Sequence, residues 1–136
     1  MPTFEAKAWL ALRTRLTSLA LTPVLPIAWP NEVFTPPAGG YLRVTYAPNV
    51  VVRQYTNSRV SYRPGIFLVN VVSKLNQNMA VAIEIAGKVA AHFPQDLRMS
   101  YQDVTLYVEK EPDVRQPLIT ESFVEVPVVV WYAAVA

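Results

Sequence analysis

The side chains able to support chemistry are few in this sequence, and they are scattered. The chain has one histidine, His92, and no cysteine, so a disulfide framework and a thiolate metal site are excluded. His92 falls in the last turn of a predicted helix, where a basic side chain is favourable on its own account. A structural role for His92 is therefore a better interpretation than catalysis, although imidazole titrates near neutral pH.

The other polar candidates show no catalytic or metal-binding spacing. No serine stands in a nucleophile elbow, and no pair of histidine or carboxylate residues has the separation of metal ligands. Asp103, Glu109 and Glu111 lie on or after an exposed strand, which indicates solvated acids. Gly39-Gly40 lacks the spacing and the following helix of a phosphate-binding loop, so it indicates a turn. The sequence predicts no catalytic residue, no metal site, no cofactor and no enzyme.

Composition predicts one soluble domain that spans residues 1–136. The chain is 52% hydrophobic and 16% charged, which excludes a disordered protein. The N-terminus lacks the basic start and apolar core of a signal peptide. The longest apolar run, residues 127–136, is too short to cross a bilayer. An intracellular origin fits the absence of cysteine, and no membrane partner is expected.

Residues 63–93 form the stretch around which the other elements must pack. Pro64-Gly65 predicts a turn, residues 66–72 a buried strand, and residues 79–93 a helix that ends before Pro94. Apolar residues recur along that helix at spacings of three and four, and a flank extends this stripe. The stripe is Met79, Ile83, Ala86, Ala90 and Phe93, and the flank is Val81, Ile85 and Val89. The flank requires a second partner, either the N-terminal helix or another subunit.

The remaining elements complete an α+β fold, with a mainly antiparallel sheet and two helices packed on one face. Residues 3–21 predict a helix capped by Thr3, and residues 24–29 an edge strand or arm interrupted by Pro26. Residues 47–61 predict an extended hairpin or loop. Strands are expected at residues 41–46, 103–109 and 118–132, the last with Pro127 at an edge or bulge. The predicted core includes Trp9, Leu12, Leu16, Ile66, Leu68, Ile83, Ala86, Phe93, Leu106 and Val108.

Charge is segregated along the chain. Residues 33–83 contain no acid, whereas residues 96–125 are rich in acids. The segregation has three interpretations: solvated faces, complementary surfaces of a head-to-tail ring, or a nucleic-acid groove. The third is the weakest, because the chain has no basic run and no large basic excess. The candidate interface residues are Trp29, Phe34, Arg43, Arg53, Tyr55, Arg59, Tyr62, Val81 and Ile85.

Several short motifs resemble the tail-terminator, or tail-completion, proteins of long-tailed bacteriophages, and together they cover nearly the whole chain. They are Pro26-Ile27-Ala28-Trp29-Pro30-Asn31, Phe34-Thr35-Pro36-Pro37, Tyr41-Leu42-Arg43-Val44, Tyr62-Arg63-Pro64-Gly65-Ile66-Phe67-Leu68-Val69-Asn70-Val71, Ala90-Ala91-His92-Phe93 and Val126-Pro127-Val128. These motifs describe fold rather than chemistry. Residues 47–61 depart from the family pattern.

The resemblance implies a structural virion protein that forms a hexameric ring at the tail-neck junction after assembly in the host cytoplasm. The ring would cap the tail tube, end its elongation and join a head-neck connector protein, with DNA passing through the lumen without specific binding. Two alternatives stay open, a head-closure or neck protein and a DNA-contacting module. The expected partners are further copies of the chain, the tail-tube protein and the connector.

Overall fold

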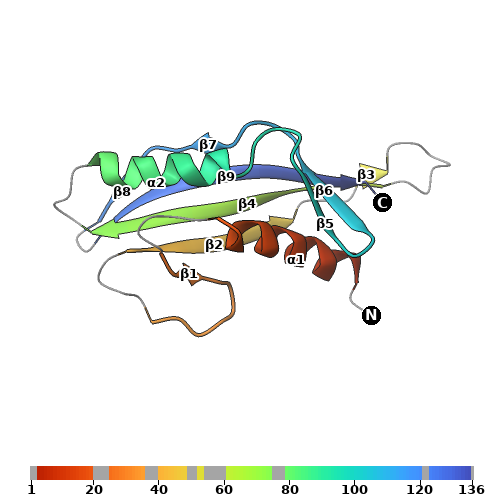
Figure 1. Ribbon diagram of the computed structural model, residues 1–136, viewed down its shortest axis with the longest axis horizontal. Coiled ribbons are helices and arrows are strands. Elements are labelled where there is room, and N and C mark those ends of the chain that lie inside the picture. The colour runs from red at the N-terminus through yellow and green to blue at the C-terminus, as the bar shows by residue number, and fades with distance from the viewer. Residues whose placement is uncertain are drawn as a thin grey trace.

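The computed structural model describes residues 3–19, 25–35, 40–48, 52–53, 61–74, 79–120 and 123–135. The described elements are two helices and nine strands, and all nine strands join one sheet (Figure 1). The order along the main path of this sheet is β1-β2-β4-β9-β6-β5. Only the β1–β2 pair is parallel. The expected α+β class with a mainly antiparallel sheet is confirmed.

Three long strands form the centre of the sheet. They are β2 (Tyr41–Pro48), β4 (Ser61–Lys74) and β9 (Phe123–Val135). β4 lies between the other two, paired with β2 over eight positions and with β9 over thirteen. Because side chains alternate between the faces of a sheet, this register fixes which residues share a face. Phe67, Val69 and Val71 point to one face, and Ile66, Leu68 and Asn70 point to the other.

Short strands border the central three. β1 (Ile27–Ala28) lies beside β2, and β3 (Val52–Arg53) pairs with the start of β4. On the other side, β6 (Val104–Val108) pairs with the end of β9 and with β5 (Arg98–Tyr101). β7 (Asp113–Val114) and β8 (Leu118–Ile119) pair with the first half of β9. The sequence patterns predicted β6 and its inward residues but missed β5.

The first helix, α1 (Phe4–Thr17), starts where the sequence predicts. The Thr3 hydroxyl accepts a hydrogen bond from the Ala6 amide at 3.3 Å, which satisfies one of the free amides of the first turn. The helix ends at Thr17, four residues before the predicted end. Residues 20–24, which include the end of the predicted helix, lie outside the described residues.

Both helices lie on the same face of the sheet, toward the viewer in Figure 1. α1 packs over β5 and β6, and α2 (Met79–Ala91) packs over β9, β4 and β7. The core between these layers is dominated by valine, leucine and phenylalanine. Its largest fully buried side chains are Phe67, Phe93, Leu12, Leu16, Leu42, Leu106, Val69, Val71, Val89, Val108, Val126 and Val128. In the part of the chain that the structure describes, helices cover one face of the sheet only.

The predicted facing of α2 is wrong in one important respect. Ala82, Ala86 and Val89 face the sheet, whereas Ile83 is 44% exposed. The helix is apolar almost all round, so hydrophobicity does not select the face that packs inward. Size selects it, because small side chains let the helix approach the valine-rich strands closely. Ile83 therefore leaves the predicted core.

Ile66 and Leu68 also leave the predicted core. Both are half-buried and lie on the sheet face that carries no helix. Trp9 is half-buried and packs against the edge of the core. The other predicted core residues are buried: Leu12, Leu16, Ala86, Phe93, Leu106 and Val108.

The predicted turn at Pro64-Gly65 is a continuous part of strand β4. Gly65 is needed there because Tyr132, on the adjacent strand β9, lies over it. A Cβ atom at Gly65 would come within 2.3 Å of the Tyr132 hydroxyl oxygen, far inside van der Waals contact. The glycine is explained by this close approach and not by a turn.

Pro127 was predicted at an edge or bulge, yet it lies within the central strand β9, opposite Asn70. Its carbonyl accepts a hydrogen bond from the Arg115 amide at 2.8 Å, on the side of β7 and β8. The Pro127 nitrogen faces the same side, because the N and C=O groups of a residue in antiparallel sheet share a direction. The outer strand is interrupted there between β7 and β8, so the missing N–H costs no ladder bond.

Candidate interface

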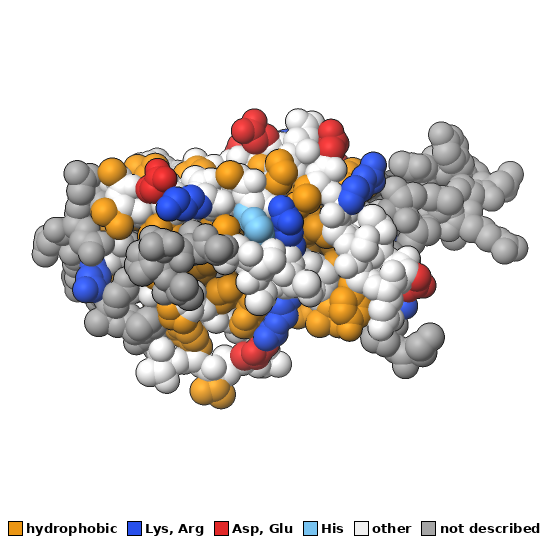
Figure 2. Space-filling view, in the orientation of Figure 1, with side chains coloured by type: hydrophobic (Ala, Val, Ile, Leu, Met, Phe, Trp, Pro, Cys, Tyr) orange, Lys and Arg blue, Asp and Glu red, His pale blue; other side chains and the backbone are white. Residues whose placement is uncertain are grey.

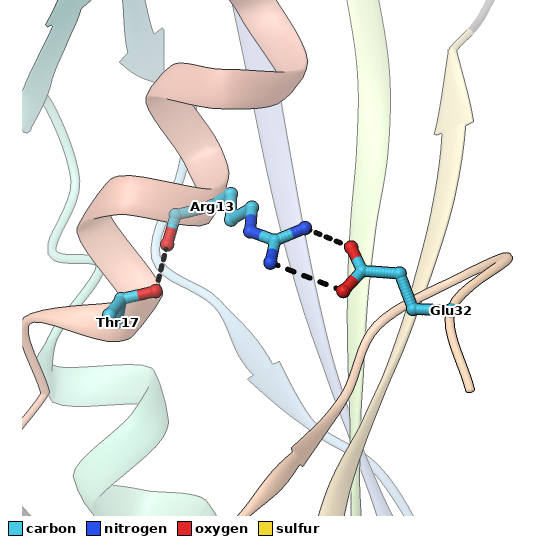
Figure 3. Close-up of polar contacts among 3 residues, drawn as sticks. All are labelled: Arg13, Thr17 and Glu32. Carbon is cyan, nitrogen blue, oxygen red and sulfur yellow. Dashed lines mark hydrogen bonds and ion pairs between the residues drawn. The ribbon is translucent and has the colours of Figure 1, made fainter. Parts of the chain in front are cut away.

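Trp29, predicted as an interface anchor, packs against α1 in the same chain. The Arg13 guanidinium lies 4.5 Å from the centre of the Trp29 ring, and the Trp9 ring meets its edge at 5.8 Å. Arg13 also binds both carboxylate oxygens of Glu32, as Figure 3 shows. This guanidinium lowers the pKa of the Glu32 carboxyl, chiefly through the hydrogen bond. The turn after β1 is thus fastened to the outer side of α1.

Phe34 and Arg43 are also engaged within the chain. The Phe34 ring lies 5.0 Å from that of Tyr41. The Arg43 guanidinium forms an ion pair with Glu125 at 2.5 Å, across strands β2, β4 and β9. This pair joins the acid-free segment to the acid-rich one inside a single protomer. The charge segregation in the sequence is therefore partly neutralised before any assembly.

The other basic and aromatic candidates fall in or beside the predicted hairpin. In the strand register, Arg53 of β3 lies opposite Ser61 of β4. Tyr62 of β4 lies opposite Val52 of β3 on one side and Val135 of β9 on the other. The side chains of Arg53 and Tyr62 lie outside the described part of the structure, and so do Tyr55 and Arg59 entirely. Their role at an interface stays a prediction.

The outer surface of α2 is apolar and uncovered. Val81 is 45% exposed, so α1 does not cover this part of the predicted flank, while Ile85 is half-buried. Ile83 is exposed on the other side of the helix. Glu84 and Lys88 are the only charged residues of α2. Figure 2 shows hydrophobic side chains spread over this helix.

A second apolar surface lies on the sheet face without helices, which is the far face in Figure 1. Its central positions belong to β4 and β9, where outward residues in a half-exposed antiparallel sheet are normally polar. Most of them are apolar here: Ile66, Leu68, Pro127 and Trp131 are half-buried, and Val72, Val129 and Ala133 are buried. Continuous apolar runs of this kind are typical of strands buried on both faces.

Cations border the apolar part of this sheet face and lie over its aromatic rings. Lys110 Nζ is 3.7 Å and the Arg115 guanidinium 5.7 Å from the centre of the Trp131 ring. The Arg98 guanidinium lies 5.2 Å from the centre of the Tyr107 ring. An apolar centre with tryptophan, bordered by arginine and lysine, has the composition of a protein–protein interface. Sequence analysis missed this surface, although the apolar runs of β4 and β9 were a signal for it.

His92 connects the ends of the two helices. Its Nε2 atom lies 2.8 Å from the Arg15 carbonyl and 2.9 Å from the Ser18 hydroxyl, and the Arg15 side chain donates to the His92 carbonyl at 2.9 Å. Burial lowers the pKa of this imidazole. The contacts give His92 a structural role in the described part of the chain.

Among the described residues, no group of three or more histidine and carboxylate side chains is placed to hold a metal ion. Neither described helix is both long enough and apolar enough to span a bilayer.

Comparison with known proteins gives the family. A family model described as phage tail terminator protein matches residues 7–132. One solved structure is 31% identical to this chain, covers 93% of it and 92% of its own length, and superposes with a TM-score of 0.79; its designation is an identifier that states no function. No protein of curated function matches the chain. The family match spans nearly all of the chain, including both apolar surfaces. The chain therefore belongs to the phage tail terminator family, a family of structural proteins of the virion.

Proposed function

We propose that this protein forms a ring that caps the phage tail tube, ends its elongation and joins the tail to the head-neck at the tail-neck junction. Residues 1–136 act as one domain in this ring, which is hexameric and lets DNA pass through its lumen without specific binding. The protein carries out no catalysis. Its partners are further copies of itself, the tail-tube protein and a head-neck connector protein, and it assembles in the host cytoplasm.

The family match over residues 7–132 carries this proposal. The structure supports it through a subunit with exposed apolar side chains on α2 and half-buried apolar side chains on the sheet face opposite the helices. A helix that is hydrophobic all round is normally buried on all sides, yet Val81 and Ile83 of α2 are exposed. Such a protomer gains stability by association, as an assembly subunit does.

The alternative of a DNA-contacting module was based on the arginines between positions 43 and 63. Arg43 forms an ion pair with Glu125, and Arg63 donates to Glu5 at 3.0 Å. Each pair lowers the charge available to phosphate groups. A head-closure or neck protein remains the structural alternative, because it would also assemble through apolar surfaces.

The experiment mixes the purified protein with polymerising tail-tube protein of the same phage. Electron microscopy should show tubes that stop growing and carry a ring-shaped cap at one end, and native mass spectrometry should give a closed oligomer of the protein alone or on the tube. Tubes that elongate as fast with the protein as without it would rule out capping. Binding to connector protein without any effect on tubes would favour the neck alternative.

A further inference from the structure

Two apolar surfaces lie on opposite sides of the protomer, and no described helix packs on either of them. The exposed side of α2 that carries Ile83, Gly87 and Ala91, at spacings of four, is what we name the helix surface. The outward side of β4 and β9, which we name the sheet surface, presents the half-buried residues Ile66, Leu68, Pro127 and Trp131. The helix layer and the sheet stand between them (Figure 1).

Two different surfaces on opposite sides suit a heterologous contact better than a two-fold one. A two-fold contact uses the same surface on both subunits and would leave the other apolar surface exposed to water. A head-to-tail contact uses both surfaces in every subunit and closes into a ring if the rotation between subunits fits. Stacking α2 of one copy on the sheet of the next would cover each central sheet on both faces.

The charged residues around the two surfaces also differ in sign. The described charges on the sheet side are five bases and three acids: Arg43, Lys74, Arg98, Lys110 and Arg115 against Glu109, Asp113 and Glu125. Around α2 the sign is reversed, because Glu84 and the adjacent Glu111 outnumber Lys88. Complementary charges at the border of a contact orient the partners and raise their association rate.

We infer that the helix surface of one copy of this chain docks on the sheet surface of the next copy, with Ile83 packed against Leu68, Trp131 and their neighbours. This inference rests on the proposed ring and names the two surfaces that close it. The occupant of each surface is a second copy, and the contact is apolar at its centre and charge-matched at its border.

The test uses two variants, each of which breaks one surface. Ile83→Glu places a charge on the helix surface at an exposed position, so the fold should be retained. Leu68→Glu places a charge on the sheet surface at a half-buried position. Each variant alone should associate at least about tenfold more weakly than the parent in sedimentation-velocity runs, because a carboxylate would have to be buried unpaired. Circular dichroism verifies that each variant is folded.

The decisive measurement is the mixture of the two variants. Each variant retains the surface that the other lacks, so one intact contact can form and growth must then stop. The mixture should contain a heterodimer and no larger species. Val33→Glu is the matched control, because Val33 is fully exposed on the loop after β1, outside both surfaces, and this variant should assemble like the parent.

Several outcomes would overturn the inference. If the parent forms a ring and Ile83→Glu forms it equally well, the helix surface is not the contact, although the proposed ring stands. A mixture that remains monomeric would exclude head-to-tail pairing of these surfaces. If Leu68→Glu does not fold, the double variant Lys110→Glu/Arg115→Glu takes its place as the sheet-surface variant. This double variant is then mixed with Ile83→Glu. A parent that stays monomeric, alone and on tubes, would remove the proposed ring and this contact together.

Discussion

The two helices cover the same face of the sheet, but different forces hold them there. Polar side chains of α1 bind other elements: Lys7 pairs with Asp103, Arg13 with Glu32, and Glu5 with Arg63. α2 carries only two charged residues and is held by the burial of Ala82, Ala86 and Val89. The polar side of α1 is therefore used inside the protomer, whereas the outer side of α2 is apolar and remains available to a partner. Helices in one layer can thus have different roles, one in the fold and one in assembly.

The largest effect is expected where α1 enters the core. Leu12 is fully buried between α1 and the sheet. Leu12→Ala should lower the free energy of unfolding by about 2–5 kcal/mol, because it removes buried methyl groups and leaves a cavity. Urea denaturation of the monomeric protein measures this. A loss below about 1 kcal/mol would mean that α1 is not a core helix.

The next prediction tests which side of α2 faces the sheet. Ala86→Leu should cost about 1–3 kcal/mol, because the added carbon atoms have no space beneath a fully buried alanine. Ile83→Ala should cost less than about 1 kcal/mol in the monomer, since Ile83 is half in water. Thermal melts of both variants at a concentration below assembly provide the comparison. The opposite ranking would restore the facing that the sequence pattern predicted.

A smaller effect is expected for the polar side of α1. Arg13→Ala removes the cation–π contact with Trp29, which is worth about 0.5–1 kcal/mol at an exposed site. Its effect should shrink at high salt, because the Arg13–Glu32 pair is screened there. Arg13→Lys is the matched control, since it keeps the charge but loses the two-pronged contact with the carboxylate. Chemical denaturation at low and high salt, followed by tryptophan fluorescence, measures both variants.

The smallest effect concerns the junction of the two helices at His92. Burial lowers the pKa of the folded imidazole below its ordinary value of 6.5, so the unfolded chain binds the proton more readily. Stability should therefore fall as the pH drops below about 6.5, until the folded imidazole is also protonated. His92→Gln should remove this part of the pH dependence. The measurement is the melting temperature of the parent and of His92→Gln between pH 7.5 and pH 5.5. A difference in melting temperature between the two proteins that stays constant over this range would contradict the prediction.

Much of the fold was predictable from the chain because local patterns determine it. The Thr3 cap, the alternation in β2 and β6 and the alanine-rich helix are short-range signals, and each appears where predicted. The short strands β5 and β7 were missed, because two to four residues carry too little pattern to be recognised. The strand predicted at residues 118–132 is two strands, β8 and β9, which pair with each other antiparallel.

The tertiary structure decided the features on which the candidate interface depends. The sequence by itself determined that α2 is apolar on nearly every side and that β4 and β9 are continuous apolar runs. Only packing selected Ala82 and Ala86 for the sheet and left Ile83 outside, because the closeness of two layers depends on side-chain size and not on hydrophobicity. Only pairing showed that Gly65 makes room for Tyr132 and that Arg43 meets Glu125. These partners are distant in the chain, so no local pattern contains them.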